Sequence, residues 1–348
     1  MKIGILLPYK ENYSPNYPGS ISIFLKDINN FSTFKKNTII YGSTNYSNRF
    51  SKNYINIDLK KKFFSSLTKQ YLKKFIDKTS NKKIDILEIH NRPNYVKYLL
   101  KSFDNIVLYF HNDPTKQKGS KTKSERLNLI KNLKFVVFNS QWTKKKFLTD
   151  LNISNKMKKK LLVIHQSTNK CKIKLQNKQK IICFIGRLNL SKGYDLFGKA
   201  VIKILDKYSN WKAIVIGDEP REELNFNHKN LKKLGFKSHN YVMNLLKKVS
   251  ICVVPSRWEE PFGRTALEAS SRGCAVIVSN RGGLKEVSKH SIKLKQLSYQ
   301  SVFNAINKLI SYPDLMNNLQ KDSLKNFILT HQYISKKIDS YRNEIIKT

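Results

Sequence analysis

One stretch decides the fold of this chain: IICFIGRLNLSKGYDLFGKAVIKILDKY, residues 181–208. It begins with five consecutive apolar residues, Ile181–Ile185, a length and composition typical of a β-strand buried on both faces. A loop with glycines and basic residues follows, and then an amphipathic stretch, Asp195–Tyr208, predicts a helix. A buried strand, a glycine-containing loop and a helix in this order are typical of the first half of a βαβ unit.

The same alternation of apolar runs and helical patterns extends over the whole chain. The other predicted strands are Ile3–Leu7, Thr38–Tyr41, Ile84–Ile89, Ile106–Phe110, Phe135–Phe138, Leu161–Ile164, Ala213–Ile216, Ile251–Val254 and Ala275–Ser279. Near-continuous apolar strands separated by helices indicate parallel sheets covered on both faces. Because the pattern restarts after the polar, lysine-rich stretch Ser167–Lys180, we predict an α/β protein of two doubly wound parallel-sheet domains. The domains are expected to face each other across a cleft.

The length of 348 residues fits two domains, since single cores stop growing beyond roughly 250–300 residues. We place the N-terminal domain at residues 1–168, a linker at 169–180 and the second domain at 181–325. Leu315–Thr348 has helical spacing and few strand formers, and residues 326–348 are its last segment. We expect this last segment to form a helix that packs back towards the N-terminal domain.

The chain is strongly basic, with 66 Lys and Arg against 24 Asp and Glu and a formal net charge of +42. Residues 1–168 hold 33 of the basic and 10 of the acidic residues, so the excess is spread over both halves. A nucleic-acid-binding protein usually concentrates positive charge on one face or tail. Two explanations stay open: a lysine-rich composition, or attraction to an anionic membrane surface through clusters such as Lys116–Lys123, Lys144–Lys146 and Lys156–Lys160.

No apolar stretch reaches the roughly 20 residues that span a bilayer. The first residues, 1–8, form a short apolar run without a cleavage-like site and predict a first strand rather than a signal peptide. We therefore expect a cytoplasmic protein, with peripheral binding to the inner membrane face as an option. The four cysteines show neither C-x-x-C spacing nor histidines at zinc-ligand spacing, so no metal site is predicted.

The loop after the strand Ile181–Ile185 is the first candidate ligand site. Arg187 leaves the strand and Lys192 follows five residues later, near the start of a helix. An arginine bridges phosphate oxygens with two parallel hydrogen bonds and a lysine adds a compact charge. The pair suits a diphosphate. In so basic a chain, two ordinary solvated cations are the alternative.

The second candidate is the segment EEPFGRTALEA, residues 259–269, after the strand Ile251–Val254. Its glycine and proline shape a loop before a helix that runs from Arg264 to Arg272, and the first amides of that helix favour an anion. Glu260 lies in the loop and Glu268 one turn inside the helix, where carboxylates accept hydrogen bonds from sugar hydroxyls. A third segment, Gly282-Gly283, is either a plain turn or a close approach of backbone to ligand.

In this order and spacing, the three motifs resemble those of the retaining glycosyltransferases of family four. The family has the GT-B architecture of two Rossmann-like domains. The resemblance implies that Arg187 and Lys192 hold the donor diphosphate. It further implies that Glu260 contacts the hydroxyls of the donor sugar and Glu268 those of the ribose.

Further donor-side residues follow from the same resemblance. Phe236 lies where the family forms its nucleobase pocket. The residues expected to assist through the loop and the helix start are Phe262, Gly263, Arg264 and Thr265. The chain has no Asp-x-Asp sequence, which the other main glycosyltransferase architecture uses to hold a metal, and we therefore expect a metal-independent enzyme without a cofactor.

The N-terminal half resembles the family less closely. Gly19 stands where the family often has a glycine pair near the donor phosphates, but Ser20 replaces the second glycine. The resemblance places His111 beside the transferred sugar, which makes it a catalytic candidate together with Glu260, Arg187 and Lys192. The candidates on the acceptor side are His90, Asn91 and Asp113, all at the ends of predicted strands. Strand-ending turns with satisfied polar groups are the alternative.

Together these features predict a hexosyltransferase that moves a sugar from a nucleotide-diphosphate sugar to a glycan or lipid-linked acceptor. Bacterial cell-surface polysaccharide or lipopolysaccharide synthesis is the expected setting. Two alternatives remain, a sugar phosphorylase or nucleotide-sugar epimerase on the same fold, and, from a different class, a basic nucleic-acid-binding protein. The sequence leaves the donor base, the sugar, the acceptor and the oligomeric state open.

Overall fold

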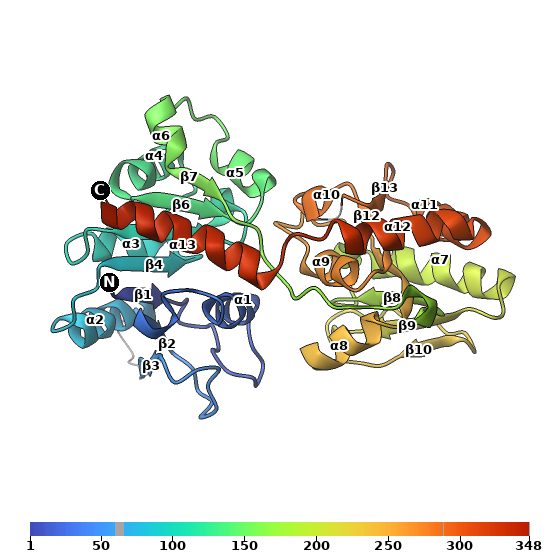
Figure 1. Ribbon diagram of the computed structural model, residues 1–348. Helices are drawn as coiled ribbons and strands as arrows, with labels where there is room; N and C mark the ends of the chain where they lie inside the picture. The colour runs from blue at the N-terminus through green and yellow to red at the C-terminus, as the bar shows by residue number, and fades with distance from the viewer. Residues whose placement is uncertain (60–65, 288, 348) are drawn as a thin grey trace. The chain divides into compact units, whose positions relative to one another are not determined.

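The computed structural model describes residues 1–59, 66–287 and 289–347 and divides into two compact α/β units (Figure 1). The first unit comprises Met1–Ser167 together with the segment that begins at His331. The second unit is Thr168–Thr330. The chain thus crosses from the first unit to the second once and returns for its last helix.

The first unit contains a parallel sheet, which has seven strands in the described residues, in the order β3-β2-β1-β4-β5-β6-β7. The strands are β1 Ile3–Leu6, β2 Thr38–Gly42, β3 Tyr54–Asn56, β4 Ile86–His90, β5 Ile106–Phe110, β6 Phe135–Phe138 and β7 Leu161–Val163. The helices are α1 Ser20–Asn29, α2 Leu67–Thr79, α3 Pro93–Leu99, α4 Lys123–Asn132, α5 Gln141–Phe147, α6 Asn155–Lys159 and α13 His331–Lys347. The central strands β4 and β5 are buried throughout, as their apolar composition requires.

The second unit repeats this plan with six parallel strands among the described residues, in the order β10-β9-β8-β11-β12-β13. The strands are β8 Gln179–Ile185, β9 Lys212–Ile216, β10 Leu231–Lys233, β11 Val249–Val254, β12 Ala275–Ser279 and β13 Ser291–Leu294. The helices are α7 Tyr194–Lys207, α8 His239–Leu246, α9 Arg264–Ser271, α10 Leu284–Val287, α11 Tyr299–Ser311 and α12 Pro313–Lys325. This is the 3-2-1-4-5-6 order of the Rossmann fold, and the prediction of two doubly wound α/β domains is confirmed.

Every predicted strand occurs in the structure, with ends shifted by at most two residues. Three further strands were not predicted: β3, β10 and β13. Each is short and lies at an edge of its sheet. An edge strand contacts a neighbour on one side only and needs no continuous apolar run, so β10, whose sequence is Leu-Lys-Lys, carries no strand signal.

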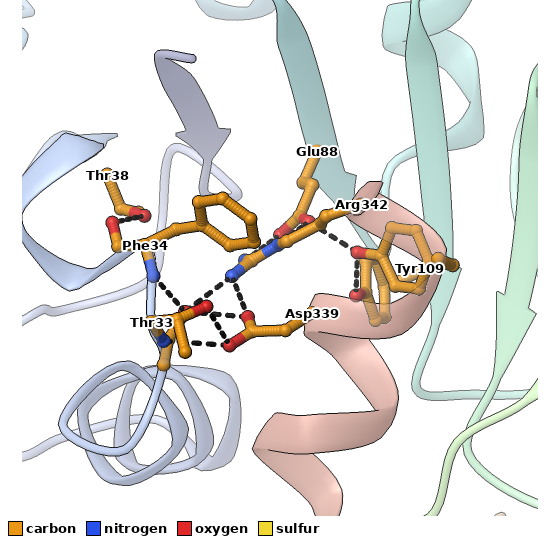
Figure 2. Close-up of polar contacts among 9 residues, drawn as sticks. Thr33, Phe34, Thr38, Glu88, Tyr109, Asp339 and Arg342 are labelled. Carbon is orange, nitrogen blue, oxygen red and sulfur yellow. Dashed lines mark hydrogen bonds and ion pairs between the residues drawn. The ribbon is translucent and has the colours of Figure 1, made fainter. Parts of the chain in front are cut away.

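The last helix, α13, belongs to the first unit and packs against α1 (Figure 1). Its Arg342 is buried and donates to Glu88 of β4 through Nε and Nη2, at 2.8 and 2.9 Å (Figure 2). Asp339, one turn earlier, accepts hydrogen bonds from Ser32 at 2.7 Å and from the Thr33 amide at 2.8 Å. These bonds satisfy the charges that α13 brings into the interior of the unit.

None of the helices in the described ranges combines the length and the apolar character needed to cross a membrane.

Candidate functional site

In the second unit, the loop after β8 is bonded to the loop after β11. The carbonyl of Ser191 accepts hydrogen bonds from the amides of Arg257 and Trp258, at 2.9 and 3.0 Å. The Arg257 guanidinium also binds both carboxylate oxygens of Asp195, at 2.5 and 2.7 Å. Because β8 and β11 are neighbouring parallel strands, both loops leave the same edge of the sheet.

Gly193 makes this contact possible. Its φ of +71° is left-handed, and a Cβ atom there would lie 2.0 Å from the carbonyl oxygen of Pro255. The pair Gly282-Gly283 has a similar role on the other side of the same loop, because Cβ atoms would lie 2.2 Å from the Glu260 oxygen and 2.4 Å from the Pro261 oxygen. The structure shows the glycine pair in close contact with the backbone of the loop that carries Glu260, and its role in shaping a ligand site stays a prediction.

The structure brings Lys192 and Glu260 together, although 68 residues separate them. The Lys192 ammonium donates to Oε1 of Glu260, and the Ser256 hydroxyl donates to the same oxygen at 3.0 Å. Asn189 fixes the other end of the lysine loop by accepting from the Lys192 amide at 3.0 Å. A cation that can bind phosphate therefore lies beside a carboxylate that can accept from hydroxyls.

Arg187, the other residue predicted to hold a diphosphate, is exposed. Within the described parts of the chain it makes neither a hydrogen bond nor an ion pair, so its guanidinium is open to an anion. Its predicted role stays a prediction.

Glu268 is buried on α9 and its Oε1 accepts two hydrogen bonds. The donors are Nε of Arg264, at 2.6 Å, and Nε2 of His239, at 2.8 Å. Burial alone would raise the pKa of Glu268, but the charges of Arg264 and His239 outweigh it, and its pKa is lowered. The carboxylate is therefore ionised and held in one orientation, and Arg264 and Glu268 form an i,i+4 ion pair on α9.

The remaining donor-side candidates differ in what their side chains contact. Phe262 is 2% exposed and packs in the apolar core under α9, so only its backbone is near the loop surface. Gly263, at φ +107°, precedes the first residue of α9, and the Thr265 hydroxyl donates to the Ile185 carbonyl at 3.4 Å. Phe236, in contrast, is 64% exposed in the loop after β10.

In the first unit, His90 and His111 form a pair. Nδ1 of His90 lies 2.9 Å from Nε2 of His111, and both rings are buried. Burial, and then the charge of Arg342, lowers the pKa of His90 to about 3. Burial and then His90 lower the pKa of His111 well below its usual range, so both imidazoles are neutral and share one N–H between them.

The other candidates of the first unit have intramolecular partners. Asn91 accepts from the His111 amide at 3.1 Å and orients the pair. Asp113 caps the short helix Pro114–Lys116 by accepting from the Thr115 amide at 3.0 Å, which is the structural alternative considered for it.

Gly19 leaves room for the carboxylate of Glu11, a residue that the sequence did not single out. A Cβ atom on Gly19 would lie 2.0 Å from Oε1 of Glu11. That oxygen accepts from the Ser22 amide at 3.0 Å, at the N-terminus of α1. Burial raises the pKa of Glu11 against the opposing hydrogen bond from Ser22. In this structure the position above Gly19 therefore holds the chain's own carboxyl group.

His239 is a second residue of the candidate site that the sequence motifs did not identify. It is the first residue of α8, just after a turn at Gly235 with φ +64°, and its only signal was its place after a strand end. Within residues 1–59, 66–287 and 289–347, no three His, Cys, Asp or Glu side chains gather as metal ligands would.

Two Rossmann-like units with this pair of bonded loops define a GT-B protein. Solved structures share the fold: sucrose-phosphate synthase from Thermosynechococcus elongatus, with 14% identity, superposes over all of both chains with a TM-score of 0.78. HepE of Anabaena in complex with UDP-glucose gives 0.75, with 16% identity over 99% of this chain and all of that one. The lipopolysaccharide glycosyltransferase WaaG gives 0.67, with 12% identity over 97% and 99% of the two chains.

Sequence comparison finds glycosyltransferases. Residues 165–325 match the model described as glycosyl transferases group 1. An uncharacterized glycosyltransferase of Methanocaldococcus jannaschii is 36% identical over 128 residues, which is 34% of this chain and about a third, 32%, of that protein's length. The putative glycosyltransferase YtcC of Bacillus subtilis is 24% identical over 75% of this chain and 73% of its own. The second unit thus matches the group 1 glycosyltransferases, and these comparisons support the resemblance of the chain to the glycosyltransferases of family four.

Proposed function

We propose that this glycosyltransferase takes its sugar from a nucleotide-diphosphate sugar and transfers it, with retained anomeric configuration, to a glycan or lipid-linked acceptor. The observation that carries the proposal is the bond between Lys192 and Glu260, together with Glu268 held by Arg264 on α9, the helix that follows the loop of Glu260. One cation for phosphate and two oriented carboxylates for hydroxyls are the groups that such a donor requires. The fold neighbour HepE, which was solved with UDP and with UDP-glucose, supports this donor class.

The chemistry that we propose rests on fixed charges. Arg187 and Lys192 stabilise the negative charge that develops on the leaving diphosphate, because prepositioned cations cost no reorganisation at the moment of reaction. When Lys192 turns to the phosphate, Glu260 is released to accept from hydroxyls of the sugar. Glu268 accepts from the ribose. The acceptor hydroxyl attacks the face that the diphosphate leaves and gives its proton to the departing phosphate oxygen.

The transferred group is proposed to be a hexose, and the reaction to need no metal. We propose that the neutral His111 of the first unit lies beside the transferred sugar. WaaG, a glycosyltransferase involved in lipopolysaccharide biosynthesis, supports a surface-glycan acceptor. The basic clusters on α5 and α6, which include Lys144–Lys146 and Lys156–Lys160, suit an anionic membrane at the cytoplasmic face, where each basic residue adds about 1 kcal/mol.

The test is a thermal-shift panel of UDP-, GDP-, ADP- and CDP-sugars. A ligand at 100 times its Kd stabilises the folded protein by about 2.7 kcal/mol, so the true donor raises the melting temperature and the others do not. Arg187→Ala and Glu268→Ala are expected to reduce that shift while the unliganded protein stays folded. Asp314→Ala, an exposed carboxylate on α12, is the control. Unchanged melting-temperature shifts in both site variants would refute the assignment of Arg187 and Glu268 to the donor site.

The stereochemical part of the proposal has its own measurement. The product formed from the donor of the panel and an acceptor glycan is analysed by NMR, which gives the anomeric configuration directly. The same configuration as in the donor supports retention, and the opposite one refutes it.

A further inference from the structure

We propose that His239 is a positioning residue of the donor site, which holds Glu268 so that its second carboxylate oxygen can accept from the ribose hydroxyls of the nucleotide. The inference deepens the proposed function and rests on it. The ligand class is a nucleoside diphosphate with an intact ribose diol.

The carboxylate geometry is the first step. Both donors to Glu268, Arg264 Nε at 2.6 Å and His239 Nε2 at 2.8 Å, bind the same oxygen, Oε1. Within the described parts of the chain, no donor contacts Oε2. A carboxylate has about four lone-pair positions on its two oxygens, so Oε2 keeps its capacity for hydroxyl donors. Two donors on one oxygen restrict the rotation of the carboxylate about its last bond more than one donor does.

The second step is the place of His239 in the fold. It begins α8, whose N-cap is Ser238, and α8 contacts α9, the helix of Glu268. The loop before it contains Gly235 and the exposed Phe236. A Cβ atom added to Gly235 would meet no other atom within 4 Å. The His239–Glu268 bond therefore connects an open loop to the carboxylate that is assigned to the ribose.

The third step is exposure. The side chain of Glu268 is 7% exposed and that of His239 36%. The histidine thus covers one side of the carboxylate while an edge of its ring stays accessible. Nε2 of the ring lies on the carboxylate, and Nδ1, the other ring nitrogen, is left for a polar group of a ligand. Loss of the ring removes a fixed orientation without removing the charge of Glu268.

The experiment compares His239→Ala, His239→Gln and His228→Ala. Glutamine keeps an N–H donor at a similar reach, so His239→Gln is the conservative rescue. His228 is a matched control in the same unit, which pairs with Asp206 at 3.3 Å and precedes β10 instead of following it. Isothermal titration measures Kd for UDP, GDP, ADP and CDP and for the 2′-deoxy form of whichever binds the wild type most tightly.

We expect the wild type to prefer the ribose form over the 2′-deoxy form, since a hydroxyl partner left unpaired costs about tenfold in affinity. His239→Ala should weaken binding of the ribose form about tenfold and bring the ratio of the two Kd values close to one. His239→Gln should retain most of the preference, and His228→Ala all of it. A retained ratio in His239→Ala would overturn the inference and leave the proposed function intact. Failure of every nucleotide to bind the wild type would refute the proposed function, and the inference with it.

Discussion

Arg342 of the last helix binds both carboxylate oxygens of Glu88, in the central strand β4, through Nε and Nη2 of its guanidinium, although 254 residues separate the two in the sequence. Arg342 is 2% exposed and Glu88 fully buried. The Tyr341 hydroxyl donates to the same carboxylate. The final helix is therefore a part of the core of the first unit and not an appendage (Figure 2).

Removal of one partner of this ion pair should destabilise the protein strongly. Arg342→Met leaves Glu88 buried without its cation, and breaking a buried pair costs about 3–5 kcal/mol of unfolding free energy. Urea denaturation measures the loss. The double variant Arg342→Met/Glu88→Gln should recover part of it, because Glu88 no longer carries an unpaired charge; Asp339, which also binds Arg342 at 3.2 Å, keeps its bonds from Ser32 and Thr33.

A matched control is Lys83→Met, in the same unit. Lys83 lies 3.9 Å from Asp85 with 86% of its side chain exposed. An exposed pair contributes little, so stability should not change. Equal losses in Lys83→Met and Arg342→Met would show that the buried network has no special weight.

The histidine pair predicts acid sensitivity of the first unit. The pKa of His90 is lowered to about 3 in the folded state, and that of His111 is lowered as well, against about 6.5 in an unfolded chain. Below about pH 6.5 the unfolded state then binds more protons than the folded state. The stability that the neutral pair contributes is therefore present above pH 6.5 and is lost as the pH falls towards 3, by at most about 1.4 kcal/mol per pH unit for each histidine.

Urea denaturation at a series of pH values between 7 and 4 measures this slope, and His90→Gln should make it shallower. The comparison with the wild type isolates the histidine from the carboxylates, which titrate in both proteins. Parallel slopes in the two proteins would contradict the assignment of a neutral pair.

Substitution of two glycines of the second unit that have left-handed backbone conformations distinguishes the cost of backbone strain from the cost of a steric clash. Gly193→Ala combines φ +71° with a Cβ atom 2.0 Å from the Pro255 oxygen, whereas Gly235→Ala, at φ +64°, meets no atom within 4 Å. Strain alone costs about 1–3 kcal/mol in either variant. Gly193→Ala should lose clearly more unfolding free energy, because the two loops must also move apart. Similar losses in the two variants would mean that the loop contact is not tight.

The local sequence predicted much of the candidate site in the second unit. Lys192 and Glu260 each follow a buried strand by a few residues, and the carboxyl ends of the parallel strands β8 and β11 meet at one sheet edge, so the proximity of the two residues follows from the order of strands and helices. His239 and Glu11 could not be found in this way. Their partners, Glu268 and the start of α1, lie on other elements, and no spacing in the sequence relates them.

The sequence by itself determined the two parallel sheets, because a strand buried on both faces must be apolar along its whole length, wherever it lies in the chain. It also determined the loops that hold the basic and acidic groups of the donor motifs. Only the tertiary structure decided the edge strands β3, β10 and β13, the His90–His111 pair and the burial of Arg342. An edge strand is buried on one side alone, and a charged residue in a helix becomes an internal group only when packing brings its counter-charge within hydrogen-bonding distance.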